Sequence, residues 1–255
     1  MTRRPWRAAM LLAGIPLVLA SCSSSGGSNP GGNAVTGAIT VYAASSLTEA
    51  FGTLEKTFVA AHPGTSITFD FGASSDLATQ IDNGAKADVF AAASPSTMAD
   101  VTSAVHPADF TSNKLEIATP PGNPAHVTSV ADLAKPGVKV AVCDPAVPCG
   151  TVAQTVFSNA KVTVKPAAQE ADVKSVVAAV ESGEVDAGLV YVSDVHEAGA
   201  KVHGVPIPDA VNSTTIYPIA VLKDAPNPAT ARAFVQLVGS AAGRRVLTAN
   251  GFGPA

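Results

Sequence analysis

The chain has 255 residues, of which 47% are hydrophobic and 14% charged, and its formal net charge is −4. This weak negative charge and the lack of a basic tract argue against nucleic acid and acidic membrane surfaces as partners. The five histidines are scattered through the sequence without the spacing of metal ligands, so we expect no bound metal ion.

The first residues have the form of an export signal. Three arginines within the first seven residues precede an apolar run over residues 8–20, which is shorter than a bilayer-spanning helix. A signal peptide is therefore predicted over residues 1–22. Its end, Leu19-Ala20-Ser21-Cys22, resembles the lipobox of bacterial lipoproteins, in which the cysteine carries lipid and anchors the exported chain on the outer side of the cell membrane. The alternative is a plain secretory signal in which Cys22 has no role.

Residues 23–37 are almost entirely Ser, Gly, Asn and Pro. Such a composition cannot bury enough apolar surface to fold, so a flexible tether is predicted here. The remaining part of about 220 residues is long enough for one large domain or two smaller lobes.

From residue 38 onward, short β-rich runs alternate with segments of helical period, which is typical of α/β proteins with mostly parallel sheets. Strands are predicted over 38–43, 66–71, 88–92 and 115–119. One helix should begin at Ser46, because Ser46 and Glu49 have the spacing of a capping box. A second helix should follow residues 72–75 with Ser74 or Ser75 as its N-cap, and a third should span 96–105.

The breakers at residues 119–124 predict a crossing into a second lobe. The elements predicted there are helices over 130–133, 150–159 and 172–182 and strands over 138–142, 162–164 and 187–192. An extended run over 215–222 would return the chain, and helices over 228–238 and 242–249 would complete the first lobe. The expected lobes are thus residues 38–119 with 222–255, and residues 120–221, with a ligand cleft between them that closes about a hinge.

Two serine turns follow strands and precede helices, at residues 44–47 and 73–76. The start of a helix presents unpaired N–H groups and the positive end of the helix dipole, and a serine adds a hydroxyl donor. Residues 148–150 and 170–173 have the same character. Each turn by itself could be an ordinary helix cap, but four such turns could converge on one anion in the cleft.

Cys143 and Cys149 lie close together in a chain that is predicted to be exported. A disulfide between them is therefore expected, although two buried thiols are the alternative, since the sequence does not give their separation in space.

Several motifs together carry a resemblance to a known family. They are ITVYAASSLT at residues 39–48, ASSDLA at 73–78, ADVF at 87–90, DPAVPCG at 144–150, GLVYVSD at 188–194 and YPIA at 217–220. Over residues 39–252 the chain resembles the periplasmic molybdate-binding proteins of ABC importers. The resemblance implies a two-lobed type II periplasmic-binding-protein fold, no enzymatic activity, no cofactor, a monomer, and an importer permease in the membrane as partner.

Carried over position by position, the resemblance implies hydroxyl ligands at Ser46 and Ser74, backbone N–H donors at Cys149 and Val173, and a phenol donor at Tyr191. Members of the family often carry alanine where this chain has Cys149, a change that a backbone donor tolerates. Tyr191 could alternatively be a core tyrosine at the end of a strand. The implied ligand is molybdate, and tungstate should also bind.

Hydrogen-bond donors without acceptors favour a fully deprotonated dianion, because a protonated oxyanion would need an acceptor. Asp76, Asp144 and Asp172 lie near the loops, and an inward carboxylate would weaken this selection. Three other functions stay open. The chain could bind sulfate or another oxyanion with the same fold. It could be an exported hydrolase with Ser46 or Ser74 as nucleophile, although it has no G-x-S-x-G motif. It could also be an adhesin or a structural lipoprotein.

Overall fold

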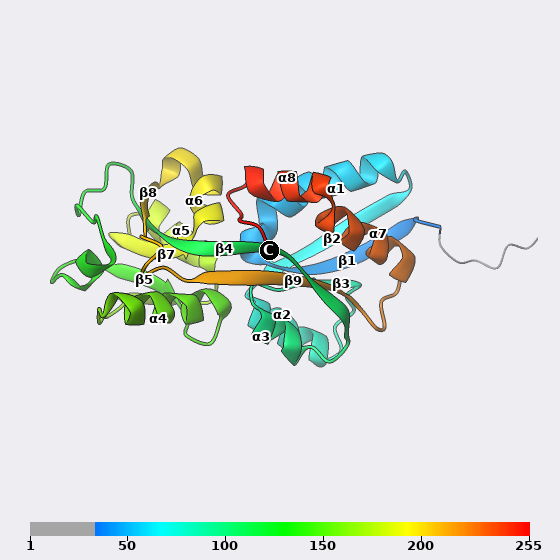
Figure 1. Ribbon diagram of the computed structural model, residues 1–255, viewed down its shortest axis with the longest axis horizontal. Helices are drawn as coiled ribbons and strands as arrows, with labels where there is room; N and C mark the ends of the chain where they lie inside the picture. The colour runs from blue at the N-terminus through cyan, green and yellow to red at the C-terminus, as the bar shows by residue number, and fades with distance from the viewer. Residues whose placement is uncertain (1–33) are drawn as a thin grey trace, which may run out of the picture. The chain divides into compact units, whose positions relative to one another are not determined.

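The computed structural model describes residues 34–255. The predicted signal peptide, its Cys22 and all but the last four residues of the predicted tether lie outside these residues. Within residues 34–255, nine strands form one continuous hydrogen-bonded arrangement in the order β2-β1-β3-β9-β4-β7-β5-β6, with β8 also paired to β4 (Figure 1). The strands are β1 (Gly37–Ala44), β2 (Thr65–Gly72), β3 (Val89–Ala91), β4 (Ala104–Thr119), β5 (Val140–Cys143), β6 (Ala168–Glu170), β7 (Ala187–Tyr191), β8 (His203–Pro206) and β9 (Thr214–Leu222).

Strands β1, β2 and β3 are parallel to one another and form the first sheet, and β9 runs antiparallel along β3. Helices α1 (Thr48–Ala61), α7 (Pro228–Gly239) and α8 (Ala241–Ala249) cover one face, whereas α2 (Ser74–Asp82) and α3 (Pro95–Asp100) cover the other (Figure 1). The rings of Phe51 and Phe58 each meet Phe234 edge to face, with centroids 5.7 and 5.6 Å apart. This aromatic contact between α1 and α7 joins the first helix to the last part of the chain.

The second sheet contains the parallel strands β5, β6 and β7, and the last residues of β4 run antiparallel between β7 and β8. Helices α4 (Pro148–Ala160), α5 (Val173–Glu181) and α6 (Val192–Ala198) pack around it. The valines of α5 lie directly on β7: a Cβ at Gly188 would come within 2.6 Å of Val176 and 3.0 Å of Val180. The absence of a side chain at this glycine therefore lets the helix approach the strand closely.

The two-lobed α/β arrangement predicted from the sequence is confirmed, and strands β4 and β9 connect its halves. Residues 104–114 of β4 pair with β9, whereas residues 115–119 pair with β7 and β8. Because the partner of β4 changes between residues 114 and 115, we propose that the chain crosses between the lobes inside this strand. The breakers at residues 119–124, where the crossing was predicted, follow the end of the strand.

Several predicted elements need correction. The helix predicted over 96–105 ends at Asp100, because the chain turns there and residues from Ala104 onward pair with β9. Residues 162–164 form no strand despite their two valines, and residues 168–170 pair with β5 in their place. Alternating β-branched residues favour an extended chain, but a strand also requires an unpaired neighbour in register. Strand β8 and helix α6 were not predicted.

No helix within residues 34–255 is long and apolar enough to cross a bilayer. The same residues contain no group of three or more His, Cys, Asp or Glu side chains that could hold a metal ion.

Candidate functional site

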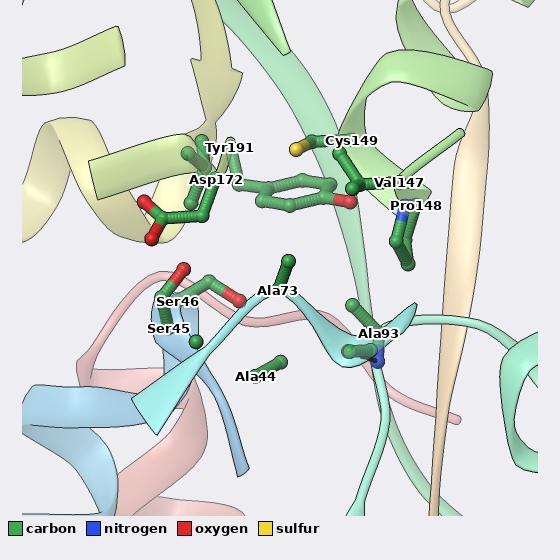
Figure 2. Close-up of a pocket in the computed structure, with 13 residues that line it drawn as sticks. Ala44, Ser45, Ser46, Ala73, Ala93, Val147, Pro148, Cys149, Asp172 and Tyr191 are labelled. Carbon is green, nitrogen blue, oxygen red and sulfur yellow. Dashed lines mark hydrogen bonds between the residues drawn. The ribbon is translucent and has the colours of Figure 1, made fainter. Parts of the chain in front are cut away.

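A small cavity lies where the turns of the two lobes meet, and all five predicted binding residues line it (Figure 2). Its lining residues are Ala44, Ser45, Ser46, Gly72, Ala73, Ser74, Ala93, Val147, Pro148, Cys149, Asp172, Val173 and Tyr191. In Figure 2 the residues of the second lobe form the upper wall and those of the first lobe the lower wall. The cavity volume is about 20 Å³. This is little more than the roughly 10–15 Å³ that one water molecule needs, so the cavity is narrow in this structure.

Ser46 is not the helix cap that its capping-box spacing predicted. Residues 45–47 form a 3-10 turn, α1 begins only at Thr48, and no side chain within these residues caps either helix. The Ser46 hydroxyl is buried and lies 2.9 Å from the phenol oxygen of Tyr217. The hydroxyl is therefore not consumed by the backbone of its own helix.

Ser74 is likewise not an N-cap. Ala73 occupies the cap position of α2 and Ser74 is the first helical residue. The Ser74 Oγ accepts a hydrogen bond of 3.0 Å from the backbone N–H of Ala93, in the loop between β3 and α3. Its own hydroxyl hydrogen remains available for a group in the cavity. The adjacent Ser75 Oγ is buried and meets no hydrogen-bond partner within residues 34–255.

Cys149 presents its backbone at the start of α4. Pro148 is in the first turn of this helix, where its missing N–H removes no helical bond, and no side chain caps the helix at Val147. The Cys149 N–H is among the first-turn donors that have no intrahelical acceptor. A disulfide joins Cys149 to Cys143 at the end of β5, with 5.8 Å between the Cα atoms. It ties the first turn of the helix to the strand that precedes it.

Val173 is the first residue of α5, and its N–H is also a first-turn donor without an intrahelical acceptor. Asp172 is the N-cap of the helix, and its Oδ1 accepts a hydrogen bond of 3.0 Å from the N–H of Ser175. Asp172 is the one carboxylate in the cavity wall from the residues that the structure describes, and one of its oxygens accepts a hydrogen bond from the helix backbone.

Tyr191 ends β7 with its side chain buried. Within residues 34–255 no atom forms a hydrogen bond with its phenol oxygen. Burial raises the pKa of this phenol well above its usual value, so the hydroxyl keeps its hydrogen at physiological pH. A buried hydroxyl that faces a cavity without a partner costs free energy unless a ligand pairs with it.

A buried ion pair joins the positions of Tyr191 and Val173. Asp194 Oδ2 accepts a hydrogen bond of 3.0 Å from the N–H of Tyr191, and its Oδ1 lies 3.2 Å from the Nζ of Lys174, the residue after Val173. Burial raises the pKa of Asp194 to about 6, against the opposing effect of Lys174. This contact connects the strand that carries the phenol to the helix that carries the backbone donor.

The cavity wall contains no lysine, arginine or histidine from residues 34–255. The polar side chains that the described part of the chain places in this wall are the hydroxyls of Ser45, Ser46, Ser74 and Tyr191 and the carboxylate of Asp172. Such an arrangement can bind an anion through neutral donors and helix starts. A hydrolase that used Ser46 or Ser74 as nucleophile would need an adjacent base, and the usual base, histidine, is not in the wall.

Two contacts of this site were not predicted from the sequence, namely those of Tyr217 with Ser46 and of the Ala93 N–H with Ser74. The motif at residues 217–220 contributed to the family resemblance but indicated no role for Tyr217. Backbone donors such as Ala93 carry no sequence signal at all.

Residues 39–253 match the family described as bacterial extracellular solute-binding protein. The chain belongs to this family. Among the relatives of this solute-binding protein are two named Molybdate-binding protein ModA, from Mycobacterium bovis and Mycobacterium tuberculosis. Each is 43% identical over 250 residues, which cover 96% of this chain and 94% of the relative. The resemblance inferred from the motifs is thus confirmed.

Solved structures of other binding proteins share the fold of this solute-binding protein. The periplasmic molybdate-binding protein of Azotobacter vinelandii has a TM-score of 0.74 and 20% identity, with 84% of this chain and 98% of that chain covered. The sulfate-binding protein SubI of Mycobacterium tuberculosis has a TM-score of 0.73 and 17% identity, with 86% and 87% covered. Proteins for two different oxyanions therefore have this fold, and the fold alone does not select between them.

Proposed function

We propose that this protein captures molybdate outside the cytoplasm, accepts tungstate as well, and delivers the ion to the permease of an ABC importer. The observation that carries the proposal is that all five predicted residues line one small cavity, to which residues 34–255 contribute no lysine, arginine or histidine. Ser46 and Ser74 supply hydroxyl groups, Cys149 and Val173 supply backbone N–H groups, and Tyr191 supplies a phenol. The relatives that are 43% identical over nearly the whole chain support the same ligand.

The donor set favours an ion without protons. Molybdate, tungstate and sulfate are dianions at neutral pH, whereas phosphate keeps at least one proton and needs an acceptor for it. Asp172 is the one carboxylate that residues 34–255 contribute to the wall, and one of its oxygens already accepts a hydrogen bond from the Ser175 N–H. We therefore expect phosphate to bind weakly.

Sulfate is the alternative ligand that the charge of the ion does not exclude, because sulfate is also a dianion. The sulfate-binding protein SubI has the same fold, so sulfate must be tested. The two ions have the same charge and shape, so the size of the cavity and the placement of its donors must discriminate between them. Molybdate is the larger ion and tungstate is nearly equal to it. A wall held by a disulfide and by packed helix starts would favour one size, because a smaller ion could not reach all five donors.

A melting-temperature panel tests the proposal. The mature protein is heated with molybdate, tungstate, sulfate, phosphate or vanadate at equal concentrations. Ligand at a hundred times Kd stabilises the fold by about 2.7 kcal/mol, which raises the melting temperature of a domain this size by roughly 5–10 °C. Molybdate and tungstate should produce this shift, and sulfate should produce little. A larger shift with sulfate than with molybdate would make the protein a sulfate binder, and no shift with any ion would refute oxyanion capture.

We also propose that lipid on Cys22 anchors the protein on the outer side of the membrane. The lipobox-like residues 19–22 support this proposal, and residues 23–37 would give the folded part room to reach the permease. Cell fractionation compares the wild type with Cys22→Ala. The wild type should sediment with membranes and the variant should not, and a variant that still sediments would contradict lipid anchoring at this residue.

A further inference from the structure

Tyr217 lies between the two lobes of the proposed site and has no assigned role. It belongs to β9, one of the two strands that connect the lobes, and its side chain is fully buried. Its phenol oxygen lies 2.9 Å from Ser46 Oγ, and its ring meets Tyr191 edge to face at 6.1 Å. Tyr217 therefore contacts one proposed donor from each lobe.

We propose that Tyr217 is a positioning residue that donates its phenol hydrogen to Ser46 and thereby directs the Ser46 hydroxyl hydrogen toward the bound ion. Tyr217 acts through Ser46 and is not among the residues that line the cavity. This inference rests on the proposed function, because it concerns the same anion site.

Packing holds the phenol in place. The ring of Tyr217 lies edge to face against Phe110 at 6.4 Å and against Phe252 at 5.6 Å. The backbone on either side of it pairs with β4. Because the ring is fixed on several sides, the phenol oxygen is held within hydrogen-bond reach of Ser46.

The direction of the Ser46–Tyr217 hydrogen bond follows from counting hydrogens. A serine hydroxyl has one hydrogen and can accept at its lone pairs. If Ser46 donates to an anion, the bond to Tyr217 persists only when Tyr217 is the donor. Burial raises the pKa of the Tyr217 phenol well above its usual value, so the phenol retains its hydrogen. The opposite direction would turn the Ser46 hydrogen away from the cavity.

Ser74 provides an independent example of this arrangement in the same cavity. Its Oγ accepts from the backbone N–H of Ala93, which can only donate. The hydroxyl hydrogen of Ser74 is consequently free for the ion. Tyr217 would donate a hydrogen bond to the Ser46 oxygen, as the Ala93 N–H donates to the Ser74 oxygen. Both serine hydroxyls of the first lobe would then direct their hydrogens toward the bound ion.

A double-mutant cycle tests the proposal. The Kd for molybdate is measured by titration calorimetry for the wild type, Tyr217→Phe, Ser46→Ala and the double variant. Tyr217→Phe should weaken binding about threefold to tenfold, the range of one neutral hydrogen bond. In the Ser46→Ala background it should change Kd less than twofold, because the residue through which it acts is gone. Tyr42→Phe, a change at a tyrosine of β1 outside the cavity wall, is the matched control and should leave Kd unchanged.

Three outcomes would overturn the proposal. An equal loss in both backgrounds would mean that Tyr217 supports the fold and does not act through Ser46. An unchanged Kd for Tyr217→Phe would mean that its phenol has no role in binding. Failure of the wild type to bind any tetrahedral oxyanion would refute the proposed function itself, and the inference with it.

A second variant keeps the ring and tests the direction of the bond if Tyr217→Phe does not fold. Incorporation of 3-fluorotyrosine at position 217 makes the phenol a stronger donor and a weaker acceptor. Binding should be equal or tighter if Tyr217 donates to Ser46. Weaker binding, with an unchanged melting temperature of the ligand-free protein, would contradict the proposed direction.

Discussion

The change Ser74→Ala should reduce both affinity and stability, for separate reasons. The Ser74 side chain is 1% exposed, and its Oγ accepts the N–H of Ala93 at 3.0 Å. The hydroxyl hydrogen is left for the ion. Replacement with alanine therefore removes one donor to the ligand and also leaves a buried backbone N–H without its acceptor.

Both effects have an expected size. A hydrogen bond to a charged group contributes about 1.5–3 kcal/mol, so Kd for molybdate should rise roughly tenfold to 150-fold. The unpaired N–H of Ala93 should destabilise the ligand-free protein by about 1–3 kcal/mol. At roughly 2–4 °C per kcal/mol for a domain of this size, the melting temperature should fall by several degrees.

Titration calorimetry and thermal melting of the ligand-free protein measure the two effects separately. Ser75→Ala is the matched control, because Ser75 is the next residue of the same helix turn and its Oγ has no partner within residues 34–255. The control should keep the wild-type Kd. Molybdate binding by Ser74→Ala within twofold of the wild type would refute the assignment of its hydroxyl, and so would an equal loss in the control.

Three further variants test other parts of the site. Tyr191→Phe removes a buried hydroxyl that has no hydrogen-bond partner within residues 34–255, so calorimetry should give a Kd for molybdate about tenfold higher. Thermal melting of the ligand-free variant should show equal or greater stability, and lower stability would mean that the phenol is already paired. Asp194 has a pKa raised by burial to about 6 from its usual 3.8, so its contribution to stability is complete below about pH 4 and is lost as the pH rises through 6. Urea unfolding at a series of pH values should show that the free energy of unfolding of the wild type falls by about 3 kcal/mol relative to that of Asp194→Asn between pH 4 and pH 6. If the free energies of the two proteins change in parallel with pH, the raised pKa of Asp194 is contradicted. Gly150→Ala would place a Cβ 1.9 Å from the Asp144 carbonyl oxygen and so displace the first turn of α4, and calorimetry should show a sharp fall in molybdate affinity. The control is Gly52→Ala, because a Cβ at Gly52 would meet no atom within 4 Å. This control should keep the wild-type affinity and gain about 0.5–1 kcal/mol in free energy of unfolding.

Local patterns predicted most elements of this fold. The run at residues 38–43 became β1, and the valines of residues 173–180 lie on the buried face of α5, because alternation and helical spacing are properties of neighbours along the chain. The prediction at residues 162–164 was wrong for the same reason. Its sequence favours an extended chain, but β5 pairs with residues 168–170. Local sequence does not specify which of two extended segments pairs with a given strand.

The role of the two serines shows the limit of local reasoning. Capping-box spacing predicted that Ser46 would satisfy its own helix, and Ser74 or Ser75 was expected to cap the next one. In the folded protein Ser46 contacts Tyr217, 171 residues away, and Ser74 accepts from the N–H of Ala93 in the loop after β3. These distant partners leave the serine hydrogens for the cavity.

Sequence by itself determined the α/β class, the serine turns after strands, and the motifs that assign the chain to the bacterial extracellular solute-binding proteins. The resemblance also named five residues as one ligand site, and in the tertiary structure these residues line one cavity. Tertiary structure alone decided that β4 pairs with strands of both sheets and which groups contact the hydroxyl of each serine. The physical reason is the separation along the chain over which each interaction acts. Propensity and capping act over a few residues of chain, whereas the direction of a hydroxyl hydrogen depends on whichever donor the fold brings within about 3 Å.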